Sequence, residues 1–130
     1  KNNLKLHPHY YQDSLKDTTL TGIEMTKKLL NLKTPPTAII CSLDKYFIGC
    51  LQECQERGLS TPKDISIVGY NDHDNYLSSQ NLTFISHPLT KMGKMAVEIL
   101  EKIEKGENPS NLSKLIEPIL NKGKSDGKIN

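Results

Sequence analysis

The sequence has 130 residues, the length of one domain, which excludes several complete domains. Hydrophobic residues make up 35% and charged residues 25%, a composition typical of a folded chain. The 17 basic residues nearly balance 15 acidic ones, and Arg57 is the only arginine. DNA-binding surfaces concentrate lysine and arginine, so we do not expect this stretch itself to contact DNA.

The sequence offers little support for an enzyme, a metal site or a membrane protein. Cys41, Cys50 and Cys54 form neither a CxxC pair nor a cluster with histidines, which favours a reducing, cytoplasmic compartment. No apolar run approaches the roughly 20 residues of a membrane span. We find no phosphate loop, nucleophile elbow or carboxylate pair, so no catalytic residue, cofactor or metal is predicted. The opening lacks an initiator methionine and a helix-start signal, and we expect a piece of a longer protein.

The apolar pattern predicts alternating helices and strands along the chain. The first helix is capped by Thr18 or Thr19 and stopped by Pro35 and Pro36. A strand over 37–42 follows, and then a helix that starts at Asp44 and that Gly58 closes. Two further strands are expected over 64–70 and 82–86. A helix over 89–105, between Pro88 and Gly106, and a short strand over 114–120 complete the pattern. The polar tail that follows is expected to fray.

This order predicts a parallel sheet. Strands joined by helices through short connections form right-handed βαβ units, so the fold class is α/β with a doubly wound sheet. Ligands bind such sheets beyond the carboxyl ends of the strands. Here the first strand is followed by Ser42, Leu43 and Asp44, and the second by Asn71 and Asp72. These two polar clusters are the candidate binding rim.

Plain structural roles compete with this interpretation. Asp44 lies where a carboxylate caps the start of a helix. Asn71 and Asp72 equally suit a turn after a strand. His7 and His9 project to one side if the chain is extended, but nothing nearby completes a metal site.

The helix that starts at Asp44 is apolar around more of its surface than one sheet contact requires. Either a larger domain buries it, or one face packs on the sheet and another on a partner subunit. We favour the second interpretation. The residues expected in a two-fold interface are Phe47, Leu51, Tyr76 and Leu77.

Three segments carry a family resemblance in their order and spacing: PPTAIICSLDKYFIG, ERGLSTPKDISIVGYND and NLTFISHPLTKMGKMAVEIL. Together they resemble the effector-binding core of the lac-repressor/galactose-repressor (LacI/GalR) family of bacterial transcription regulators. The resemblance implies a periplasmic-binding-protein-like (type I) fold of two α/β subdomains with a sugar or other small effector between them. It assigns residues 1–84 and 115–130 to the C-terminal subdomain and the 89–105 helix to the N-terminal one. By this resemblance, we expect the DNA-binding headpiece to lie outside this stretch.

The resemblance also implies roles for single residues. Asn71 is expected to contact the effector directly, and Asp44 and His87 to share its rim, together with Asp72 and Leu43. Two positions depart from the family pattern, because Leu43 replaces an asparagine and Asn71 replaces an aspartate. Both changes put a simple sugar effector in doubt.

The sequence therefore predicts the ligand-sensing and dimerisation module of a LacI-type regulator, and not an enzyme. The expected partners are a small effector, a second copy of the chain, and operator DNA reached through the missing headpiece. The alternative is a sugar-binding component of a transport or chemosensory system with the same fold.

Overall fold

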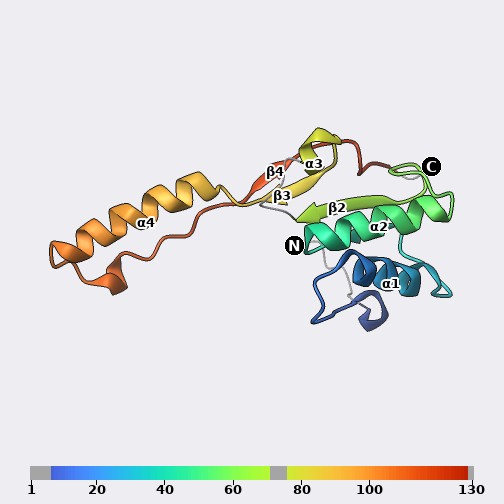
Figure 1. Ribbon diagram of the computed structural model, residues 1–130, viewed down its shortest axis with the longest axis horizontal. Helices are drawn as coiled ribbons and strands as arrows, with labels where there is room; N and C mark the ends of the chain where they lie inside the picture. The colour runs from blue at the N-terminus through green and yellow to red at the C-terminus, as the bar shows by residue number, and fades with distance from the viewer. Residues whose placement is uncertain (1–6, 71–75, 129–130) are drawn as a thin grey trace.

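The computed structural model describes residues 7–70 and 76–128 and contains a four-stranded sheet in the order β1-β2-β3-β4 (Figure 1). The strands are β1 (Ala38–Ile40), β2 (Ser66–Tyr70), β3 (Phe84–Ser86) and β4 (Ile119–Asn121). The helices are α1 (Thr19–Leu30), α2 (Asp44–Glu56), α3 (Tyr76–Ser79) and α4 (Leu89–Glu104), with 3-10 turns over Pro8–Tyr10 and Pro109–Asn111. The predicted α/β class is confirmed.

Strand direction follows from how the chain travels between strands. β1, β2 and β3 are parallel, with Ile39 opposite Ile67 and Gly69 opposite Phe84. β4 is antiparallel to β3, with Ser86 opposite Ile119. The chain leaves β3 along α4 and returns, so it enters the sheet from the opposite direction. The sheet is therefore mixed, and not wholly parallel as predicted.

The predicted helix ends are confirmed at two positions. The hydroxyl of Thr18 accepts a hydrogen bond from the Thr21 backbone amide (3.1 Å), which caps the start of α1. Gly58 has φ +72°, the left-handed conformation that closes α2.

The two long helices near the N-terminus form one layer: α2 packs on β2, and α1 packs on α2 (Figure 1). They approach closely because both carry a glycine at the contact. A Cβ on Gly22 would lie 2.7 Å from the Cα of Tyr46, and one on Gly49 would lie 2.3 Å from the carbonyl oxygen of Thr19. Glu53, which is buried, accepts a hydrogen bond from Arg57 Nε (2.6 Å).

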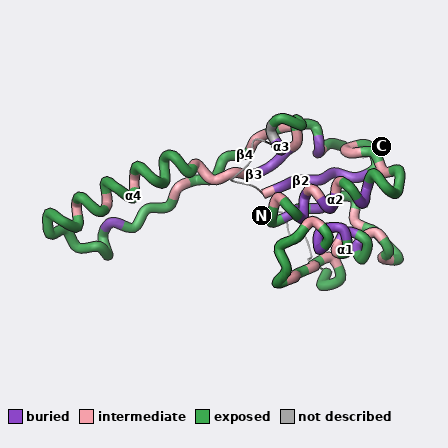
Figure 2. Tube along the Cα trace, in the orientation of Figure 1, coloured by how far each residue is buried: buried purple, intermediate pink, exposed green. Residues whose placement is uncertain are grey.

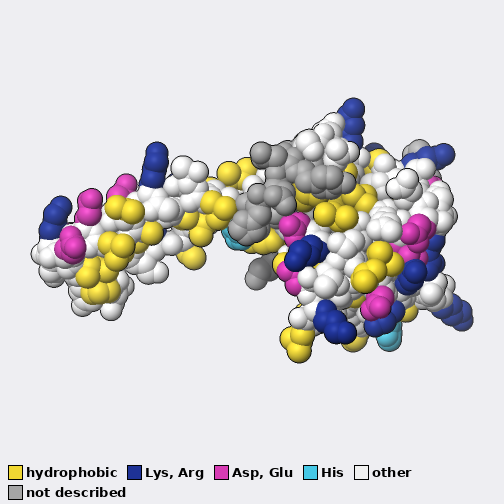
Figure 3. Space-filling view, in the orientation of Figure 1, with side chains coloured by type: hydrophobic (Ala, Val, Ile, Leu, Met, Phe, Trp, Pro, Cys, Tyr) yellow, Lys and Arg dark blue, Asp and Glu magenta, His cyan; other side chains and the backbone are white. Residues whose placement is uncertain are grey.

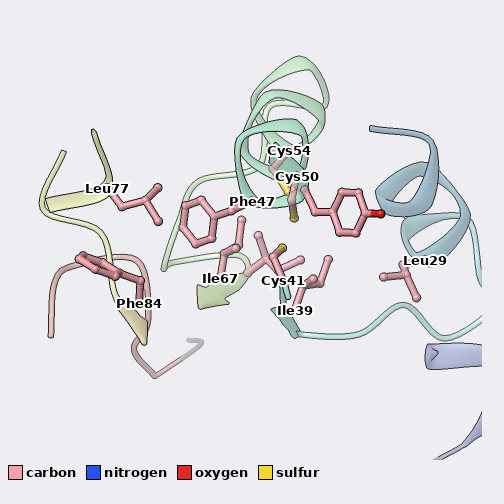
Figure 4. Packing of buried hydrophobic residues seen from close by; sticks show 11 residues of the cluster. Leu29, Ile39, Cys41, Phe47, Cys50, Cys54, Ile67, Leu77 and Phe84 are labelled. Atoms are coloured by element: carbon pink, nitrogen blue, oxygen red, sulfur yellow. The ribbon is translucent and has the colours of Figure 1, made fainter. Parts of the chain in front are cut away.

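The core lies between α2, the sheet and α3. Phe47 points from α2 towards Leu77 of α3 and lies over Ile67 of β2 (Figure 4). The three cysteines continue this core towards α1, Cys41 from β1 and Cys50 and Cys54 from α2. All three are free thiols. This core positions the carboxyl ends of β1 and β2.

The C-terminal segment is ordered by hydrogen bonds, so the prediction of a fraying tail is wrong for the described residues. Ser125 is buried, and its hydroxyl donates to the carbonyl of Ile67 (2.7 Å) and accepts from the amide of Thr83 (2.8 Å). The Ile67 amide in turn donates to the carbonyl of Ser125 (2.7 Å). We call residues 122–127 the strap. The strap bridges Ile67 of β2 and Thr83, the residue before β3, on the N-terminal side of the point where β2 and β3 pair.

Helix α4 and the returning chain project away from the rest of the molecule (Figures 1 and 2). We call residues 89–118 the arm and the other described residues the body. No residue of α4 is buried. Apolar side chains gather along the arm (Figure 3), and the exposed ones on α4 are Leu89, Met92, Val97, Leu100 and Ile103. Within the described residues, no helix is long and apolar enough to cross a membrane.

Candidate functional site

The carboxyl ends of the three parallel strands meet at one edge of the sheet, where the binding rim was predicted. Leu43 follows β1, Tyr70 ends β2, and His87 follows β3. Asn71 and Asp72 lie outside the described residues, so their roles stay predictions. The geometry supports the edge as a meeting point of strand ends and the segment leading into the arm.

A hydrogen bond joins β2 to that segment. The hydroxyl of Tyr70 and Nε2 of His87 are 2.5 Å apart. Their rings meet edge to face, with centroids 5.0 Å apart and planes at 83°. Both side chains are half-buried. His87 therefore lies at this edge of the sheet with part of its hydrogen-bonding capacity used by Tyr70, and its role in effector binding stays a prediction.

At the end of β1, Asp44 and Leu43 begin helix α2. The Asp44 carboxylate accepts a hydrogen bond from the Lys45 backbone amide (2.7 Å), so it satisfies one free amide of the first turn. Leu43 occupies the cap position without a side-chain hydrogen bond and leaves 36% of its surface exposed. Helix capping accounts for this contact of Asp44, while Leu43 offers an apolar surface at the rim.

A cavity of about 440 Å³ opens beside β1 and reaches the rim at Ser42. The typical range for ligand sites is about 300–1,000 Å³. Its walls come from α1, from the whole of β1 and from residues 10–13, a segment that no sequence motif had pointed to. Leu43, Asp44 and His87 are not among its lining residues. The aromatic and polar run Tyr10, Tyr11, Gln12 and Asp13 ahead of the first helix is the signal that could have identified this wall.

The predicted interface residues occupy different environments. Phe47 is 0% exposed and Leu77 is 1% exposed, and both belong to the core. Their side chains cannot reach a partner, so assigning them to an interface was wrong. Tyr76 begins α3, but its side chain lies outside the described part. Leu51 is half-buried beside Ile48 and Leu59 in an outward groove of about 310 Å³.

Two of the buried cysteines, Cys50 and Cys54, have raised thiol pKa values. A hydrogen bond with Cys41, together with burial, raises the pKa of Cys50 to about 12. A hydrogen bond with Cys50, together with burial, also raises the pKa of Cys54. The thiolate is the form that acts as nucleophile and metal ligand, and it is disfavoured at Cys50 and Cys54. Within residues 7–70 and 76–128, no group of three or more His, Cys, Asp or Glu side chains is arranged to hold a metal ion.

Comparison with known proteins adds evidence for the family. Residues 1–125 match the family described as a periplasmic binding protein-like domain. The chain is 40% identical over 92 residues to the HTH-type transcriptional repressor PurR of Glaesserella parasuis, which covers 68% of this chain and 27% of that repressor. It therefore spans little more than a quarter of this relative.

Solved structures agree with this assignment. A LacI-family regulatory protein from Chloroflexus aggregans is 29% identical with a TM-score of 0.84, and the match covers 95% of this chain and 45% of that one. A dimeric Lac repressor with an 11-residue C-terminal deletion is 25% identical with a TM-score of 0.71, covering 87% and 42%. These relatives are transcription regulators, not enzymes. The chain belongs to the LacI/GalR family, as part of its periplasmic-binding-protein-like effector-binding domain.

Proposed function

We propose that this chain is the ligand-sensing and dimerisation module of a bacterial LacI-type transcription regulator. It binds a small effector, a sugar or related metabolite, and thereby controls operator binding by a headpiece outside this sequence. The observation that carries the proposal is the meeting of the β1 and β2 ends with the segment that enters the arm, shown by the Tyr70–His87 hydrogen bond. A ligand at that edge touches both the body and the start of the arm.

We assign residues 1–84 and 115–130 to the C-terminal subdomain and the 89–105 helix to the N-terminal subdomain. In support, α4 has no buried residue, yet one of its faces is apolar. Amphipathic helices normally cover such a face against a sheet or another helix. The partner of α4 is then the remainder of the N-terminal subdomain, and the effector lies between the two subdomains.

Control of DNA binding follows from differential affinity. An effector that binds one relative orientation of the subdomains more tightly shifts the population towards it. The orientation of the two subdomains then sets the spacing of the headpieces in a dimer. Asn71, Asp44, His87, Asp72 and Leu43 are the proposed effector-binding residues, with Asn71 as the direct contact.

For the dimer, we propose the outward groove of α2 as the contact with a second copy. Leu51, Ile48 and Leu59 give this groove an apolar floor beside a polar margin of glutamines. The Lac repressor structure similar to this chain is described as dimeric. Leu51→Glu should shift the regulator from dimer to monomer in sedimentation velocity, because a carboxylate cannot be buried there without a partner. The exposed α1 variant Lys28→Glu is the control, and a dimeric Leu51→Glu protein would reject this surface.

The function is tested on the complete regulator. Its operator is first selected from random DNA duplexes. Dissociation of the regulator from that operator is then measured in the presence of each member of a panel of free sugars, nucleosides and nucleobases. One compound class should change operator affinity at least tenfold. With that compound, Asn71→Ala should weaken binding by about 1–3 kcal/mol in calorimetry, the cost of losing a buried hydrogen-bond partner. Failure to select any DNA would reject the regulator assignment.

We place the protein in the cytoplasm, where its free thiols stay reduced.

A further inference from the structure

The arm is joined to the body by two chain segments that are tied to each other. One leaves β3 through His87, and the other enters β4. The β3–β4 ladder places Ser86 opposite Ile119, and Asn121 Nδ2 donates a hydrogen bond to the Ser86 hydroxyl (2.8 Å). These contacts hold the two segments together, and the β2–β3 ladder, with Tyr70 opposite Ile85, joins them to the sheet; none of the ladder pairs includes His87.

The contact between Tyr70 and His87 extends the connection to β2 beyond the end of the ladder. Tyr70 is the last residue of β2, in the middle of the sheet, and His87 lies two residues before α4 begins. A 2.5 Å hydrogen bond therefore spans from the sheet to the departing segment. A rotation of the arm that begins at or before the N–Cα bond of His87 would carry the imidazole away from the tyrosine hydroxyl.

We propose that Tyr70 and His87 are positioning residues whose hydrogen bond fixes the direction of the arm relative to the sheet edge. In a regulator, this bond would link occupancy of the effector site to the orientation of the second subdomain. That regulatory consequence rests on the proposed function, whereas the mechanical role does not.

A purely structural explanation is that the two rings only fill space at the base of the arm. Their edge-to-face contact, with centroids 5.0 Å apart, is favourable without any hydroxyl. Tyr70→Phe keeps the ring and removes the hydrogen bond, so it separates the two explanations. His87→Gln retains a side chain able to hydrogen-bond, whereas His87→Leu does not.

The test measures distances between the arm and the body by electron spin resonance. Spin labels are attached at Glu98→Cys on α4 and Lys28→Cys on α1, both exposed positions. The native cysteines are at most 5% exposed, and the protein without introduced cysteines measures any background labelling. Losing a hydrogen bond of ordinary net strength should raise the population of other arm orientations about fivefold in Tyr70→Phe and His87→Leu. His87→Gln should resemble the wild type.

A matched control removes a tyrosine hydroxyl elsewhere. Tyr46 donates to the carbonyl of Lys16 (2.9 Å), far from the arm in the chain, so Tyr46→Phe should leave the distances unchanged. Unchanged distances in Tyr70→Phe, or equal broadening in Tyr46→Phe, would overturn the proposal. If circular dichroism shows that Tyr70→Phe is unfolded, the comparison of His87→Leu with His87→Gln decides: equal distances reject the proposal. No effector is used, so a failed operator experiment would leave this result standing.

Discussion

At the residue scale, the glycines within the three segments that carry the family resemblance occupy different environments. Gly49 permits the close crossing of α1 and α2, because a Cβ there would meet the Thr19 carbonyl at 2.3 Å and the Ile23 amide at 2.8 Å. A Cβ on Gly69 would lie 2.6 Å from the ring of Phe47. A Cβ on Gly93 of α4 would meet no atom within 4 Å. The same residue type thus marks tight packing in the body and an open surface on the arm.

Gly49→Ala should therefore destabilise the body. Both clashing atoms belong to backbone, so the helices must move apart, and overpacking of this kind costs about 1–3 kcal/mol. Urea unfolding followed by circular dichroism measures the free energy of unfolding. Gly93→Ala is the control and should leave it unchanged or raise it by up to about 1 kcal/mol, because alanine favours helix. A Gly49→Ala protein as stable as the wild type would show that the helix crossing tolerates a side chain.

The buried thiols give the body a dependence on alkaline pH. The pKa of Cys50 is raised from 9.0 to about 12, because Cys41 hydrogen-bonds to it and burial disfavours the thiolate. Above pH 9 the unfolded chain releases a proton that the folded chain keeps. The free energy of unfolding should then fall by about 1.4 kcal/mol per pH unit for this thiol, and should not change on its account below pH 9. Cys50→Ala should show a shallower fall between pH 9 and 11; an equal slope would contradict the assignment.

At the element scale, local signals predicted helix ends well and helix surroundings poorly. Thr18, Pro35 and Gly58 act within a few residues of their own helix, so their effects could be predicted from the sequence. Phe47 was assigned to an interface because α2 is apolar nearly all round. The residues that cover it, Leu77 and Ile67, belong to elements 20 or more positions away, a contact no local pattern reports.

The strap shows the same limit, because its polar composition predicted fraying. Ser125→Ala should cost about 1–3 kcal/mol, since the Thr83 amide and the Ile67 carbonyl would both lose a buried partner. Chemical denaturation of Ser125→Ala beside Ser113→Ala, an exposed serine of the arm, measures this. Equal stability of the two variants would show that water replaces the hydroxyl.

At the scale of the whole molecule, the candidate site was predictable where topology determines it. Parallel strands bring their carboxyl ends to one edge whatever their side chains are, so the edge could be placed from the sequence. The cavity wall over residues 10–13 was missed, because its aromatic and polar residues form no periodic pattern that connects the segment to β1. The order and direction of the strands therefore bring the sheet edge and the start of the arm together. The shape of the cavity depends instead on residues 10–13, which lie mostly outside helices and strands.

The contrast between body and arm leads to a prediction about local stability. We expect the amides of α2 to open only when the core around Phe47 unfolds, whereas α4 has no buried residue. A helix of 16 residues with little tertiary packing is marginal in water, and Leu112 is the one buried residue among the described residues of the arm. In hydrogen exchange followed by mass spectrometry, α4 amides of this chain should exchange at least about 100-fold faster than those of α2. Helix α1, which packs on α2, is the control and should be protected like α2. Protection of α4 equal to that of α2 would show that the arm unfolds together with the body and has a packing partner of its own.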